Sequence, residues 1–154
     1  MSCDNNTKIR EALRVAVEGT FMDMAFIDVI ESKSEKPVES SGVLYIAFSH
    51  PVDGGMILRL PMECKRMIVE NIHAADWEDL SSEEKDDCLL EALNVLAGNF
   101  LNAYCGKESS HNMSFPQMLF DEEEISGQNS YESFRFDAEG VIFQIDLCVE
   151  VCAS

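Results

Sequence analysis

One long amphipathic helix constrains the fold of this chain more than any other feature. Ser81 is followed three residues later by Glu84, and this pair forms a capping box that opens a helix. Large apolar residues then recur every three or four positions, at Leu89, Leu93, Leu96, Phe100 and Tyr104. Gly106 supplies a C-terminal stop. The pattern predicts a helix of about 36 Å, at 1.5 Å per residue, which would form the spine of the molecule.

The opposite face of this helix is polar and contains a regular stripe. Four residues spaced i, i+4, i+7 and i+11 form it: Asp87, Glu91, Asn94 and Gly98. At about 100° per residue they share a narrow line, roughly 140° from the apolar face. Carboxylates, a carboxamide and a residue without a side chain suit close approach by a partner. Polar residues at this spacing also form ordinary solvated helix faces, so the spacing alone leaves both interpretations open.

The composition bounds the class of protein and its partners. The chain has 154 residues, the size of one domain, and 46% of them are hydrophobic, which is enough for a full core. The formal net charge of −18 would repel phosphate backbones and anionic lipid surfaces. We therefore expect neither nucleic acid nor a membrane as a partner. The acidity serves solubility or steers the chain toward a basic partner, and the sequence leaves that choice open.

The cysteines and histidines indicate no metal site. Six cysteines show no C-x-x-C spacing and the three histidines are scattered, whereas a zinc site needs more closely grouped ligands. Reduced thiols in a cytosolic protein are the expected state. No apolar run has transmembrane length, and the first residues lack a signal-peptide core. We expect a soluble cytoplasmic protein.

The rest of the chain alternates between helix and strand patterns. Further helices are expected over 7–22, with Asn6 as the N-cap, and over 62–73. Strands are expected over 24–31, 43–48, 56–60, 133–138 and 141–151, with a short one near 117–120. Residues 50–55 have turn chemistry, and Glu139-Gly140 is expected to join the last two strands. In the last strand Gln144, Asp146, Cys148 and Glu150 would form a solvated face.

The order helix, proline, hairpin occurs twice, which indicates an internal repeat. The first helix contains EALRV at 11–15 and the long helix contains EALNV at 91–95. Pro37 follows the first helix and Pro116 follows the second. Chance similarity is the alternative, because Glu, Ala and Leu are common in helices. The repeated order of elements favours duplication.

The predicted organisation is one domain, 1–154, with two copies that differ at a key position. The copies would span about 7–60 and 87–152, linked by a short helix within 61–80. Asn94 of the second copy corresponds to Arg14 of the first. Chemistry that requires the asparagine could therefore not occur in the first copy.

The polar stripe resembles the signature of the chemotaxis phosphatase family of CheC, CheX and FliY. That signature is Asp or Ser, three residues, Glu, two residues, Asn, about twenty-two residues and Pro. Here 21 residues separate Asn94 from Pro116. The sequence Thr7-x3-Glu11-x2-Arg14 resembles the duplicated motif of the family with its asparagine lost. One intact motif in a short chain is more similar to CheX than to CheC.

The resemblance implies a fold, an activity and a partner. The fold would be α+β and CheC-like: long helices on an antiparallel sheet, with a pseudo-twofold repeat of helix, strand and hairpin. The activity would be hydrolysis of the aspartyl phosphate of a CheY-like response regulator. CheX-type members are homodimers joined through strands. The alternative is a non-catalytic module of the same fold that docks a receiver domain, as motor-switch proteins do.

The site residues expected are Glu91 and Asn94 for catalysis, with Asp87 and Gly98 for docking. An acyl phosphate on Mg²⁺ needs chiefly a water held in line with the breaking bond. The Asn94 carboxamide suits this role because its oxygen can accept a hydrogen from water. By the resemblance, Glu91 would pair with a lysine of the regulator. We expect no cofactor in this chain, since the Mg²⁺ would lie on the phosphorylated partner.

Gly98 also needs a reason, because glycine inside a helix costs about 1 kcal/mol relative to alanine. Its presence indicates a close contact. That contact would be with the partner or with the protein's own sheet.

Overall fold

The computed structural model describes residues 2–107, 110–119 and 131–151. Within these ranges the helices are α1 (Ser2–Ala25), α2 (Met62–His73), the short 3-10 helix η1 (Trp77–Asp79) and α3 (Ser82–Cys105). The first strands are β1 (Val29–Glu31), β2 (Gly42–His50) and β3 (Val52–Leu60). The later strands are β4 (Asn112–Met113), β5 (Gln117–Leu119), β6 (Glu132–Ala138) and β7 (Val141–Val151).

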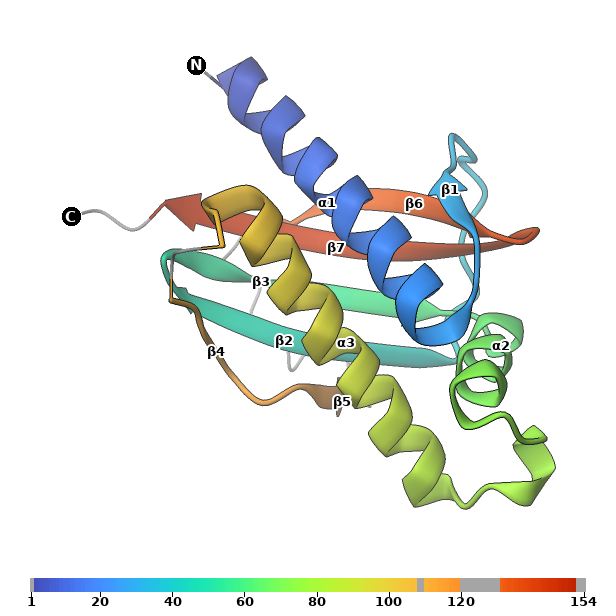
Figure 1. Ribbon diagram of the computed structural model, residues 1–154. Coiled ribbons are helices and arrows are strands. Elements are labelled where there is room, and N and C mark those ends of the chain that lie inside the picture. The colour runs from blue at the N-terminus through green and yellow to red at the C-terminus, as the bar shows by residue number, and fades with distance from the viewer. Residues whose placement is uncertain (1, 108–109, 120–130, 152–154) are drawn as a thin grey trace.

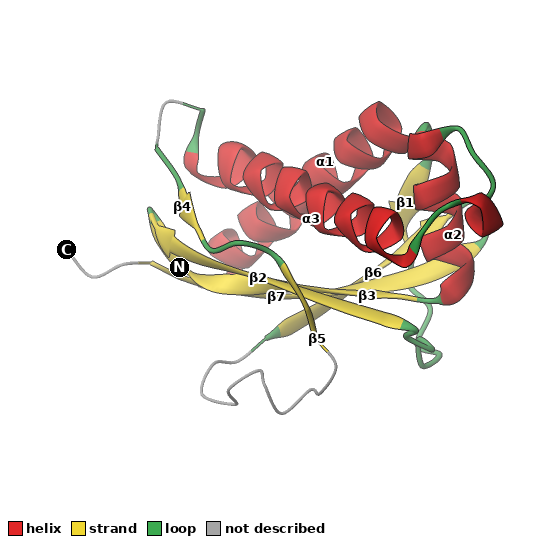
Figure 2. Ribbon diagram, turned by 90° about the horizontal axis from the view of Figure 1, so that it is seen from below, coloured by secondary structure: helices red, strands yellow, loops and turns green. Residues whose placement is uncertain are grey.

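The strands form one antiparallel sheet, and the helices pack on one of its faces. The strand order is β1-β6-β7-β3-β2-β4, and β5 also pairs with β2. Helices α1 and α3 lie side by side across the sheet, with α2 at one end (Figure 1). Figure 2 shows the three helices together above the sheet. The predicted α+β architecture, with long helices packed on an antiparallel sheet, is confirmed.

The fold has an internal pseudo-twofold arrangement. Helices α1 and α3 each have 24 residues, and they start at residues 2 and 82, 80 positions apart. The short strand after α1 pairs with the second hairpin, as β1 with β6, and the short strand after α3 pairs with the first hairpin, as β5 with β2. The order therefore reads alike from both ends around the central β3–β7 pair. Because each half completes the other's sheet, the two halves share one core.

The core lies between the sheet and the two long helices. Phe21 of α1 stacks on Phe143 of β7 at 5.0 Å between ring centroids, and Phe48 of β2 stacks on Phe100 of α3 at 6.1 Å. All four side chains are buried. Burying one such side chain contributes about 1.5–3 kcal/mol. These contacts fix which face of each helix points away from the sheet.

The first helix is longer than predicted, and the strand after it is shorter. Asn6 is not the N-cap, because the helix begins at Ser2. The Tyr104 hydroxyl donates a hydrogen bond to Asn5 Oδ1 at 2.7 Å, and this bond holds the first turns of α1 against α3. The strand predicted over 24–31 is wrong in its first part. The helix ends where Phe26 takes a left-handed φ of 56°. The strand starts only at Val29, where pairing with β6 begins.

The turn predicted over 50–55 is confirmed, but it is shorter than predicted because the flanking strands extend into this range. The chain reverses at His50 and Pro51, and β3 already begins at Val52. A Cβ at Gly54 would lie 1.9 Å from the carbonyl oxygen of Cys148 on β7. The glycine is therefore required for close approach between two strands rather than for a turn.

The face of β7 predicted to be solvated is partly buried. Asp146 and Cys148 are 7% and 3% exposed. The Asp146 carboxylate accepts from Arg59 Nε at 2.8 Å, and from Ser133 Oγ and Gln144 Nε2 at 2.7 Å each. Buried carboxylates occur in proteins when such partners satisfy them. The alternation of side chains along β7 was predicted correctly, but the burial of this face was not.

Candidate functional site

The ends of α3 are fixed by the caps that the sequence predicts. Glu84 N donates to Ser81 Oγ at 3.1 Å, and Ser81 N donates to Glu84 Oε1 at 3.2 Å. The hydrogen bond from the Ser81 backbone lowers the pKa of the Glu84 carboxyl. At the other end Gly106 N donates to Asn102 O at 3.0 Å. Fixed ends and a buried apolar face set the rotation of the helix.

This rotation places the four predicted site residues on one outward face. Asp87 and Glu91 are exposed, whereas Asn94 and Gly98 are partly buried. Along the helix they span about 16 Å, at 1.5 Å per residue. We call this stripe of four residues the motif face.

The polar side chains of the motif face are free to bind another molecule. Among the residues described, Asp87, Glu91 and Asn94 form no side-chain hydrogen bond or ion pair. Asn99, on the next turn, differs, because its amide donates to Thr20 Oγ1 of α1 at 2.8 Å. Asn99 therefore serves helix packing, while the Asn94 amide keeps its oxygen and its NH₂ group available.

A hollow adjoins the N-terminal half of the motif face. It has a volume of about 320 Å³. Met24 of α1 and Ile72 of α2 supply apolar lining, and Asp87 and Glu91 border it. Sequence reasoning missed Met24 and Ile72, because only the packing of three helices brings them to the motif. The hollow could hold an apolar group of a partner beside the two carboxylates.

Gly98 leaves the C-terminal end of the motif face open. A Cβ added there would have one neighbour within 4 Å, the Cε atom of Met113 in β4 at 3.9 Å. This is an ordinary contact distance, so packing against the sheet does not require glycine here. Close contact with the protein's own sheet therefore does not explain the glycine at position 98.

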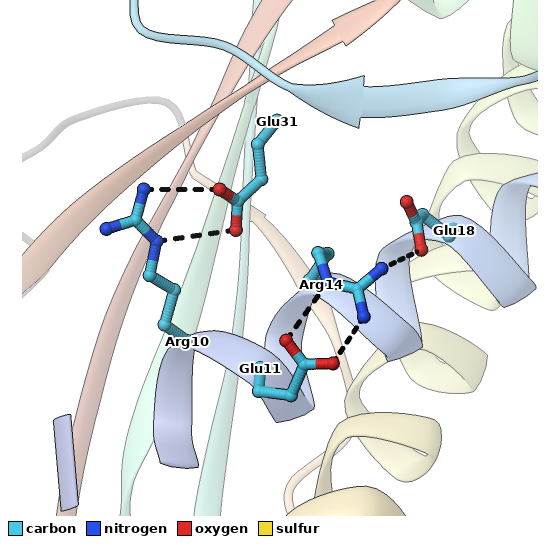
Figure 3. Close-up of polar contacts among 5 residues, drawn as sticks. All are labelled: Arg10, Glu11, Arg14, Glu18 and Glu31. Atoms are coloured by element: carbon cyan, nitrogen blue, oxygen red, sulfur yellow. Dashed lines mark hydrogen bonds and ion pairs between the residues drawn. The ribbon is translucent and has the colours of Figure 1, made fainter. Parts of the chain in front are cut away.

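The equivalent face of α1 is closed by ion pairs (Figure 3). Arg14 Nε donates to Glu11 Oε2 at 3.1 Å, and Arg14 Nη1 donates to Glu18 Oε2 at 2.6 Å. The hydrogen bond from Arg14 lowers the pKa of Glu11. Arg10 also pairs with Glu31 of β1, at 3.1 Å. In the first copy the charged side chains of this face thus pair with one another, whereas those of the motif face are unpaired among the described residues.

Two other features are absent from the described residues. Within the ranges given above, no group of three or more His, Cys, Asp or Glu side chains is arranged to hold a metal ion. None of the helices described there combines the length and the hydrophobicity needed to cross a bilayer. The motif face remains the chief candidate site.

Comparison with known proteins identifies one matching family. The family model described as chemotaxis phosphatase CheX matches residues 43–139, a range that contains the motif face. No curated protein matches the chain in sequence. Among solved structures, CheX from Desulfovibrio desulfuricans has a TM-score of 0.72 and 13% identity, covering 92% of this chain and 99% of its own.

Two other solved structures have the same fold. The CheX of the CheX–CheY–BeF₃–Mg²⁺ complex from Borrelia burgdorferi has a TM-score of 0.67 and 18% identity, covering 91% of this chain and 96% of its own. The FliM middle domain of Vibrio alginolyticus has a TM-score of 0.61 and 10% identity, covering 95% and 93%. At these identities the likeness concerns the fold alone.

Proposed function

The chain belongs to the CheX family of chemotaxis phosphatases, and we propose that it hydrolyses the aspartyl phosphate of a CheY-like response regulator. One observation carries the proposal: an Asn94 amide without a partner among the described residues lies next to an exposed Glu91 on one face of the capped helix α3. The complex of a CheX with CheY from Borrelia burgdorferi supports a receiver domain as the partner. We place this reaction in the cytoplasm.

Asn94 would orient the attacking water. An acyl phosphate on the regulator's own Mg²⁺ is already electrophilic, so the phosphatase has to supply little covalent chemistry. The amide oxygen accepts a hydrogen bond from the water, and the NH₂ group can donate to a phosphoryl oxygen. Holding the water in line with the breaking bond removes much of the entropic part of the barrier.

Glu91 would dock the regulator by pairing with a lysine of its active site. Glu91 lies about one turn before Asn94, so that ion pair would set the register of the amide against the phosphoryl group. Asp87, one turn further back, would add attraction for the same basic region. Gly98 would let the helix backbone come close to the partner. The net charge of −18 favours a partner whose contact surface is basic.

A docking module without turnover is the second candidate. It would need the carboxylates of the motif face but not the amide. The fold is compatible with it, because the FliM middle domain is also a structural neighbour. The free Asn94 amide favours the enzyme.

We also propose that the chain is a homodimer joined through a strand edge. Strand β1 has three residues and pairs only with Phe136–Ala138 of β6. It therefore leaves Glu132–Phe134 of β6 without pairing from β1. Open edges tend to recruit another strand. Light scattering coupled to size-exclusion chromatography tests this, and a monomer at micromolar concentration would count against it.

The central experiment measures the lifetime of the phosphate on a panel of phosphorylated, Mg²⁺-loaded receiver domains, with and without this protein. We expect the wild type to shorten the lifetime on at least one of them. Asn94→Ala should be about a hundredfold slower, equivalent to about 2.7 kcal/mol of barrier, while still binding the receiver. Equal rates for the variant and the wild type would exclude Asn94 as the catalytic residue. Binding without a shorter lifetime would establish the docking module instead.

A further inference from the structure

Phe115 is exposed to an unusual degree for a large apolar residue. Its exposed fraction is 93%, the highest among the exposed large hydrophobic residues of the described chain. It lies in the three-residue connection between β4 and β5. Single exposed apolar residues are common, so exposure alone indicates no function. The backbone and the surroundings of Phe115 add further information.

The backbone at Phe115 is held in place. Ser114 N donates to the carbonyl oxygen of Ala47 in β2 at 2.9 Å, and Ala47 N donates to Ser114 Oγ at 2.9 Å. Pro116 follows directly, and its ring fixes its own φ and restricts the backbone of Phe115. An aromatic ring on a restrained backbone loses little conformational entropy when a partner covers it.

The connection that bears Phe115 borders the motif face. Met113, two residues earlier, places its Cε atom 3.9 Å from where a Cβ of Gly98 would lie. Strand β5, two residues later, contacts α3. In Figures 1 and 2 the segment from β4 to β5 runs along the edge of the sheet that α3 covers. A partner seated on the motif face would therefore extend toward this connection.

We propose that Phe115 is an apolar anchor for the receiver domain that docks on the motif face. This inference rests on the proposed function, and it adds a contact outside the motif. The motif face offers charges and an amide, which give specificity and a fast encounter more than affinity. Aromatic side chains on a restrained backbone commonly supply the affinity that such polar surfaces lack. The chemistry expected of the partner is an apolar patch beside the active-site lysine that Glu91 would pair with.

A second copy of this chain is the other conceivable occupant, and the structure favours it less. Residues 114–116 belong to no strand, since β4 ends at Met113 and β5 starts at Gln117. They therefore offer no regular edge to another strand. The connection is continuous with the motif face instead, through Met113 and Gly98.

The test compares Phe115→Ala with wild type in binding and in turnover. The binding probe is a CheY-like receiver domain loaded with Mg²⁺ and beryllofluoride, measured by titration calorimetry. We expect Phe115→Ala to raise Kd and KM at least tenfold with kcat unchanged, because the ring contributes equally to ground-state and transition-state binding. Phe115→Tyr should stay within about twofold of wild type. Val15→Ala is the control, since Val15 is 48% exposed on α1, outside both the motif face and the proposed dimer edge.

The outcomes separate this inference from the proposed function. Unchanged Kd and KM in Phe115→Ala, with a wild type that still shortens the phosphate lifetime, would overturn the anchor and leave the phosphatase intact. Loss of binding in Phe115→Ala, with a wild type that binds without turnover, would support the anchor and overturn the enzyme. A change in oligomeric state with unchanged receiver binding would assign Phe115 to self-association and overturn the anchor. Absence of binding by the wild type to every receiver tested would overturn both.

Discussion

Arg14 occupies in α1 the position that Asn94 occupies in α3, 80 residues later, but only the asparagine is free. The Arg14 guanidinium is paired with Glu11 and Glu18, whereas no described side chain pairs with the Asn94 amide. Glu18 in turn corresponds to Gly98, where no side chain can close the surface. Two positions of the shared helix pattern therefore distinguish the ion-paired face of α1 from the open face of α3.

Arg14→Ala should leave dephosphorylation of a receiver domain within about twofold of wild type. The α1 face is self-paired, so removing its arginine changes no group that we assign to docking or catalysis. Steady-state kcat/KM for the phosphorylated receiver measures this, with Asn94→Ala as the matched variant on the equivalent helix. A tenfold or larger loss in Arg14→Ala would instead place the α1 face in the contact with the partner.

Glu91→Gln should weaken docking more than it slows chemistry. The change keeps the shape of the side chain and removes its charge, so the ion pair with a basic group of the receiver is lost. We expect KM to rise about tenfold and the salt dependence of kcat/KM to flatten. Glu39→Gln is the control, because Glu39 is exposed in the polar connection before β2. Identical salt dependence in the two variants would remove Glu91 from the interface.

The sequence predicted α3 and the orientation of its motif face, because these depend on local rules. The capping box of Ser81 and Glu84 and the stop at Gly106 are confirmed, and the 3.6-residue period then fixes which side chains face outward. The family read from the motif is confirmed by the CheX match. The catalytic and docking roles assigned to the motif residues stay predictions.

Features that depend on tertiary packing could not be predicted in this way. Gly54 was read as part of a turn because glycine favours turns, but close approach between β3 and β7 is what requires it. Asp146 was placed on a solvated face, since the alternation of a strand gives no information about what covers it. The nearness of Met24 to Glu91 also follows only from the packing of helices far apart in the chain.

Arg59→Ala should destabilise the fold without a specific effect on the site. It would leave the Asp146 carboxylate, whose side chain is 9% exposed, without its countercharge on the sheet face opposite the helices. Breaking one partner of a buried pair costs about 3–5 kcal/mol. Arg66→Ala is the control, because Arg66 is 44% exposed in its pairs with Glu70 and Glu78 and should change stability by less than about 1 kcal/mol. Equal urea midpoints for the two variants would contradict this account.

The stability of the fold should fall as the pH rises above about 8.5, and Cys64 contributes to this. Burial raises the pKa of the Cys64 thiol to about 12, above its value in an unfolded chain. Between these pH values the unfolded chain releases the proton and the folded chain keeps it. The contribution is therefore complete at neutral pH and is lost as the pH rises toward 12.

Urea titrations at pH 7 and pH 10 measure this effect. Cys64→Ala should be less stable at pH 7, because it leaves a cavity, but it should lose less stability between the two pH values than wild type. Equal losses would show that the thiol does not contribute.

Gly98→Ala should stabilise the protein and impair its function at the same time. Gly98 lies inside α3 with no atom closer than 3.9 Å to an added Cβ, and alanine in a helix is favoured by about 1 kcal/mol over glycine. The matched control is Gly19→Ala, because Gly19 lies inside α1 with no heavy atom within 4 Å of an added Cβ.

Both variants should therefore raise Tm by a similar amount, measured by calorimetry. Only Gly98→Ala should raise KM for the phosphorylated receiver, because only the methyl group added at position 98 would lie between the motif face and the partner. If both variants kept the wild-type KM while gaining stability, close approach at Gly98 would play no part in docking. If Gly98→Ala lowered Tm instead, the glycine would be serving the packing of α3 against Met113.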